Sequence, residues 1–89
     1  MEREVVMKIR RLKKGDSIAI FPFSRKYGDF FNAVAFPCPG SGPDLPIQIE
    51  EPFKAEFISY DDSIIKVFSE KYYCLVMDIS FIRDIDLVF

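Results

Sequence analysis

Few residues of this 89-residue chain could do chemistry, because the chain has no histidine and only two cysteines. The lack of histidine removes the commonest general base and the commonest metal ligand. Two cysteines, Cys38 and Cys74, cannot by themselves supply the four ligands of a zinc site. The acidic residues Asp61, Asp62 and Asp84 do not have the spacing of a calcium-binding loop. We therefore predict a protein that is not an enzyme and has no metal or other cofactor.

The basic residues are concentrated near the N-terminus. The net charge is −2, but residues 1–26 carry +5 and residues 27–89 carry −7. One interpretation is a cationic surface for nucleic acid or an acidic partner, on which Tyr27 or Phe30 stacks against a base. The alternative is that the charges keep turns soluble or pair across strands. The residues of this candidate surface are Arg10, Arg11, Lys13, Lys14, Arg25, Lys26 and Tyr27.

A second candidate site is the segment 37–46, which holds four of the six prolines. Its glycines are not followed by the Lys-Ser or Lys-Thr of a phosphate-binding loop. The prolines restrict the backbone, so little conformational entropy would be lost on docking to a protein partner. A loop that only joins two layers of a sheet is the alternative. The candidate contacts are Pro39, Gly40, Ser41, Gly42, Pro43 and Leu45.

Short strands must position these candidates. Residues 5–10 alternate between apolar and polar, which predicts a half-buried strand, and Gly15 favours a hairpin turn over 13–16. A second strand is expected at 17–23, with Pro22 at its exit. Residues 30–36 and 47–50 predict two more strands.

The stretch 53–79 predicts three further strands in a meander, broken at Asp61-Asp62 and Glu70-Lys71. Residues 72–77 are apolar throughout and predict a central strand covered on both faces. A short helical turn and a closing strand are expected in 80–89. The fold class is therefore all-β, a small SH3-like or Sm-like antiparallel barrel or rolled sheet of six to seven strands in one domain. Its expected core is Val5, Met7, Ile9, Ile18, Ile20, Phe36, Phe57, Ile65, Val67, Leu75 and Met77.

The C-terminal part resembles the Sm-like (LSm/Hfq-type) RNA-binding barrels. Residues 54–61 resemble the bent strand that ends at an aspartate in this family, followed by strands at 63–69 and 72–77. Ile82-Arg83-Asp84 resembles the second motif, in which glycine follows arginine. The resemblance implies a small RNA-binding barrel, although Asp84 replaces the glycine of the uridine pocket. Family members begin with a helix, whereas residues 4–36 predict three strands.

Composition favours a binding protein. Ten Phe and four Tyr are many for so small an interior, and aromatic side chains left on the surface favour protein partners.

With no signal-like segment at the N-terminus and no apolar run long enough to span a bilayer, we expect a cytoplasmic protein that does not enter membranes. The sequence leaves open whether Cys38 and Cys74 are paired. We predict a non-catalytic protein-binding adaptor or inhibitor that forms a homo-oligomer or binds another protein, with no small-molecule substrate. RNA binding through the basic N-terminal hairpin is the alternative.

Overall fold

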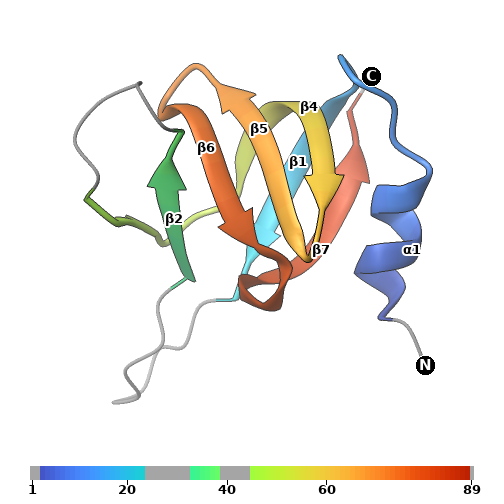
Figure 1. The fold of residues 1–89 in the computed structure, drawn as a ribbon, viewed down its shortest axis with the longest axis horizontal. Helices are drawn as coiled ribbons and strands as arrows, with labels where there is room; N and C mark the ends of the chain where they lie inside the picture. The colour runs from blue at the N-terminus through green and yellow to red at the C-terminus, as the bar shows by residue number, and fades with distance from the viewer. Residues whose placement is uncertain (1–2, 24–32, 39–44, 89) are drawn as a thin grey trace.

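The computed structural model describes residues 3–23, 33–38 and 45–88, which form a curled antiparallel sheet with one α-helix beside it (Figure 1). The seven strands of this described part lie in the order β3-β2-β6-β5-β4-β1-β7. The expectation of a mostly-β fold with a rolled antiparallel sheet is confirmed. The elements are α1 (Glu4–Arg10), β1 (Ser17–Pro22), β2 (Ala33–Pro37), β3 (Ile47–Ile49), β4 (Phe53–Asp61), β5 (Ile64–Ser69), β6 (Tyr73–Asp78), the 3₁₀ helix η1 (Ile79–Phe81) and β7 (Ile82–Leu87).

The meander expected at 53–79 is present as β4, β5 and β6. The turn between β4 and β5 has positive φ at Asp62 and Ser63, as a two-residue hairpin loop of the right twist requires. β6 lies inside the sheet, between β2 and β5, as predicted. It is not covered on both faces, however, because Leu75 and Met77 are buried whereas Val76 between them is only half-buried.

The expected helical turn and closing strand at the C-terminal end are also confirmed. The Asp78 carboxylate accepts a hydrogen bond from the Ser80 N–H (2.8 Å) and so caps η1. β7 then pairs with β1, the first strand of the chain. β1 ends at Pro22, as predicted, and its register with β7 shifts between Phe21 and Pro22.

The expected strand at 5–10 is wrong, because this segment is helix α1. Val5 and Ile9 are four residues apart, so they satisfy a helical period as well as an alternating one. In the helix both are buried against the rest of the core, together with Val6. The side chain of Arg3 fixes the start of the helix by donating hydrogen bonds to the carbonyl oxygens of Ile79 and Ile82, at 2.9 and 2.6 Å.

Residues 13–16 do not form a hairpin between strands, since they join α1 to β1. The prediction for Gly15 itself is confirmed, because its φ is +96°. Its N–H donates a hydrogen bond to the Phe57 carbonyl (2.8 Å), and the Asp16 carboxylate accepts one from the Lys13 N–H (2.8 Å). The turn therefore joins the helix to the sheet through β4.

The core lies between the curled sheet and α1. Nine of the eleven expected core residues are buried: Val5, Ile9, Ile18, Ile20, Phe57, Ile65, Val67, Leu75 and Met77. Met7 and Phe36 were wrongly expected there, since each is 49% exposed. Met7 turns outward because its segment is helical, and Phe36 occupies the outward position of β2, next to the buried Ala35.

The expected strand at 47–50 is present as β3, and that at 30–36 is present as β2 from Ala33 onward. Residues 30–32 lie outside the described part of the chain. The same is true of the candidate residues Arg25, Lys26 and Tyr27, and of residues 39–43 in the predicted binding loop.

Candidate binding surface

Exposed apolar side chains gather on the outer face of β2, β5 and β6, the face opposite the core. Phe36 on β2 lies beside Val76 on β6, and Phe68 on β5 lies beside Cys74 on β6. Phe36 is 49% exposed and Phe68 is 44% exposed. The side chains come from neighbouring positions of adjacent strands, so they form one continuous surface.

Tyr73 belongs to the same surface through an unusual backbone conformation. Its φ is +62°, although it is the first residue of β6 and carries a bulky side chain. By simple alternation it would share the inward face with Leu75. Instead its ring meets the edge of the Phe68 ring at a centroid distance of 6.4 Å, and the residue is 66% exposed. We call Phe36, Phe68, Tyr73 and Val76 the outer aromatic patch.

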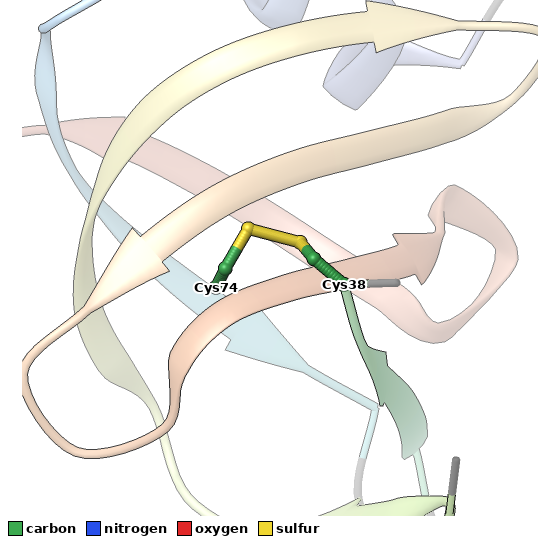
Figure 2. Close-up of a disulfide and its surroundings, with 2 residues drawn as sticks. All are labelled: Cys38 and Cys74. Atoms are coloured by element: carbon green, nitrogen blue, oxygen red, sulfur yellow. A yellow bond between two sulfur atoms is a disulfide. The ribbon is translucent and has the colours of Figure 1, made fainter. Parts of the chain in front are cut away.

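A disulfide between Cys38 and Cys74 lies within this patch (Figure 2). Figure 2 shows it connecting the end of β2 to β6, and the two Cα atoms are 5.4 Å apart, a normal spacing for such a bond. The Cys38 N–H also donates a hydrogen bond to the Cys74 carbonyl (3.1 Å). The sequence left this pairing open, because Cys74 in an apolar strand fits equally well as a small hydrophobic residue.

A groove of about 770 Å³ adjoins the patch, and Phe68 lines both. The groove lies where β5 ends at Ser69 while β4 continues back to Phe53, so β4 is paired with β5 only from Glu56 onward. Its walls carry charges of both signs, which suits a polar rim around an apolar contact. The residues that line it include Ser17, Lys54, Glu56, Phe68, Glu70 and Lys71.

The described part of the basic cluster lies around the C-terminal end of α1 and in the turn that follows it, which is hydrogen-bonded to β4 at Phe57. Arg10 ends the helix, and Arg11, Lys13 and Lys14 follow it with exposed side chains. Arg11 helps to line a small hollow of about 220 Å³ against β7. The structure therefore brings these four residues together but does not place them on the outer aromatic patch.

Lys8, a further cation on α1, forms ion pairs with the C-terminal strand β7. Its Nζ lies 2.8 Å from Asp84 Oδ1 and 3.3 Å from Asp86 Oδ1. The hydrogen bond to Asp84 raises the pKa of Lys8, and the same hydrogen bond lowers the pKa of Asp84. This pair attaches the polar side of α1 to β7, so we assign it a structural role.

Of the candidate contacts in the predicted binding loop, Leu45 is within the described residues and is 66% exposed. The predicted segment began too early, because Pro37 is the last residue of β2. Cys38, the next residue, is buried and covalently attached to β6. The loop therefore begins at the edge of the outer aromatic patch.

Phe36, Phe68 and Tyr73 were not among the site residues predicted from the sequence. A signal for Phe68 was present, since it alternates with the buried Val67 and Ser69 and falls on the side of β5 that should be polar. The surplus of phenylalanine was the second signal. Tyr73 could not be found this way, because its position depends on one backbone angle.

Within the described residues, no three His, Cys, Asp or Glu side chains are grouped to hold a metal ion. None of the described helices has both the length and the apolar character needed to cross a membrane. Comparison of the chain with protein-family models, with curated proteins and with solved structures gave no match. The site must therefore be interpreted from its own chemistry.

Proposed function

We propose that this protein is a non-catalytic interaction module, an adaptor or inhibitor, that binds a protein partner through the outer aromatic patch. Half-exposed aromatic side chains grouped on one face are costly in water and are enriched at protein interfaces. The adjoining groove, with Lys54, Glu56, Glu70 and Lys71, supplies the polar rim. The loop 37–46 starts beside the patch, and we keep it as part of the proposed contact surface.

The exposed area decides how strong such a contact can be. Covering what remains exposed of Phe36, Phe68 and Tyr73 would remove on the order of 300 Å² from water. At about 25 cal/mol per Å², this gives roughly 7 kcal/mol before the costs of association. Those costs are themselves about 4–15 kcal/mol. The patch alone therefore supports a weak complex, and tight binding requires contacts in the groove or the loop.

The observation that carries the proposal is the backbone of Tyr73. Holding a bulky residue at positive φ costs on the order of 1–2 kcal/mol, and such strain concentrates at functional sites. The strain turns an aromatic ring toward solvent and Phe68 rather than into the core. Contact with Phe68 at the surface returns only about 0.5–1.5 kcal/mol. The short hairpin loop between β5 and β6 accounts for a left-handed residue at this position. It does not account for a large aromatic side chain there, and a role in binding does.

We therefore predict that Tyr73→Asn abolishes partner binding and leaves stability unchanged or slightly higher. Asparagine adopts positive φ more readily than tyrosine and lacks the ring. In the test, a native lysate is passed over the immobilised chain and the retained proteins are compared between the variant and the unmodified chain. The melting temperature of each chain is measured in parallel. Phe23→Ser is the matched control, because Phe23 is 42% exposed but lies near Arg3, away from the patch.

If Tyr73→Asn retains the same partner as the unmodified chain, the proposed surface is wrong. A clear loss of stability in this variant would instead assign Tyr73 to folding. Light scattering on the unmodified chain shows whether the partner is a second copy, as the predicted homo-oligomer requires.

RNA binding by an Sm-like barrel is the second candidate. Helix α1 favours it, because the family begins with a helix and the sequence had predicted a strand here. Arg10, Arg11, Lys13 and Lys14 lie together at the end of this helix and would contact phosphates. Each phosphate contact should lower log K by about 0.7–0.9 per log unit of salt, whereas binding through the patch should respond little. Release of the bound partner by nuclease would favour this candidate.

A further inference from the structure

The β2–β3 hairpin is joined to the rest of the sheet by a short pairing with β6. In the described part of the chain this pairing covers Ala35 to Pro37, with one further backbone hydrogen bond from the Cys38 N–H to the Cys74 carbonyl, and β3 pairs with β2 alone. In contrast, β5 and β6 pair through six residues. In Figure 1, β2 lies at one side of the sheet and α1 lies at the other, so the helix does not cover this edge.

The hairpin also contributes little to the core. Its buried residues within β2 and β3 are Ala33, Ala35 and Ile49, of which only Ile49 is large. Short pairing and small buried side chains give a segment a low free energy of local opening. The Cys38–Cys74 disulfide is therefore the strongest single connection between this hairpin and β6.

We propose that the Cys38–Cys74 disulfide is a redox-sensitive clasp on the β2–β3 hairpin. When oxidised, it holds β2 against β6 and keeps Phe36 beside Val76, which completes the outer aromatic patch. When reduced, it allows the hairpin to open from the sheet while β6, β5, β4, β1 and β7 stay paired. The opening of the hairpin on reduction does not depend on the proposed function, whereas the effect on binding rests on the proposed function of the patch.

Reduction requires a dithiol from outside the chain. Cys38 is buried and Cys74 is half-buried, so the thiolate of the dithiol attacks the Sγ of Cys74, and Cys38 leaves as a thiolate. The second thiol of the reductant then displaces Cys74, leaving two protein thiols and an oxidised reductant. Disulfides persist in oxidising compartments and are reduced in the cytosol. In the cytoplasm that the sequence favoured, the open form would thus predominate.

The test is residue-level amide hydrogen exchange, followed by NMR, on the full chain before and after reduction with dithiothreitol. Phe36 and Val76 are paired across β2 and β6 and report on the clasp. Val67 and Leu75 are paired across β5 and β6 and report on the remaining sheet. We expect reduction to accelerate exchange at Phe36 and Val76 at least about tenfold more than at Val67 and Leu75, because a local opening of the hairpin exposes only the former pair.

Equal acceleration at both pairs would overturn the proposal, because the hairpin would then open only together with the rest of the sheet. No acceleration at Phe36 and Val76 would overturn it too, and so would complete unfolding on reduction. The double variant Cys38→Ala/Cys74→Ala repeats the measurement without reductant and should match the reduced chain. The exchange test needs no partner, so its failure and a failure of the Tyr73→Asn binding test are distinguishable.

Discussion

At the scale of single residues, the contacts that hold α1 come from the far end of the chain. Arg3 donates to carbonyl groups at Ile79 and Ile82, and Lys8 pairs with Asp84 and Asp86 on β7. Lys8 and Asp84 are 76 positions apart in the sequence, so no local pattern predicts this pair. Both side chains of the pair are partly exposed, so each interaction is weak and screened by salt.

We predict that Lys8→Met lowers stability near neutral pH by a small amount that vanishes at both pH extremes. The pKa of Asp84 is lowered from its ordinary 3.8, so its contribution is present above that value and is lost as pH falls through the lowered pKa. The pKa of Lys8 is raised from 10.5, so its contribution is present below that value and is lost as pH rises through the raised pKa.

Denaturant unfolding of the two chains at pH 2, 7 and 12 measures this difference. Lys14→Met, at a surface lysine in the same N-terminal segment, is the control. A difference between Lys8→Met and the unmodified chain that is the same at all three pH values would show that the effect is not electrostatic.

At the scale of elements, one connection sets how the helix meets the sheet. Gly15 combines a positive φ with a hydrogen bond to Phe57 on β4, so the direction of the chain and its attachment are fixed at one residue. A Cβ at Gly15 would have open space around it, with no heavy atom within 4 Å outside its chain neighbours. The reason for glycine is therefore the backbone conformation alone.

Gly15→Ala should therefore destabilise the protein by about 1–2 kcal/mol, the usual cost of the left-handed conformation for a residue with a side chain. Chemical denaturation measures the loss. Gly15→Asn, which tolerates positive φ better, should lose less than Gly15→Ala. If the two variants are equally stable, the turn has relaxed to another conformation and the argument from φ is wrong.

At the scale of the whole molecule, 89 residues give a small core, and a cross-link then matters for overall stability. The disulfide joins residues 36 apart in the sequence. In the chain-entropy description, a loop of this length stabilises the folded state by about 3–4 kcal/mol, through its effect on the unfolded chain.

We predict that Cys38→Ala/Cys74→Ala unfolds with a free energy about 3–4 kcal/mol below that of the oxidised chain. Guanidinium unfolding measures the difference. The reduced, unmodified chain is the matched control, because it lacks the bond but keeps both sulfur atoms. A loss seen in the double variant and not on reduction would come from the buried atoms that were removed, and the cross-link would then contribute nothing.

The sequence by itself determined the elements whose pattern has a single interpretation. The β4–β5–β6 meander, β1 with its exit at Pro22, and the positive φ of Gly15 follow from alternation and turn chemistry, which act between near neighbours. Only the tertiary structure decided that residues 4–10 are helical, because Val5 and Ile9 fit both periods and burial against β7 favours the helix. It likewise decided the surface position of Tyr73, the pairing of Cys38 with Cys74 and the grouping of Phe36 with Phe68. The position of Tyr73 depends on one backbone angle. The disulfide and the grouping of Phe36 with Phe68 depend on strands far apart in the chain lying side by side, and no local preference specifies that.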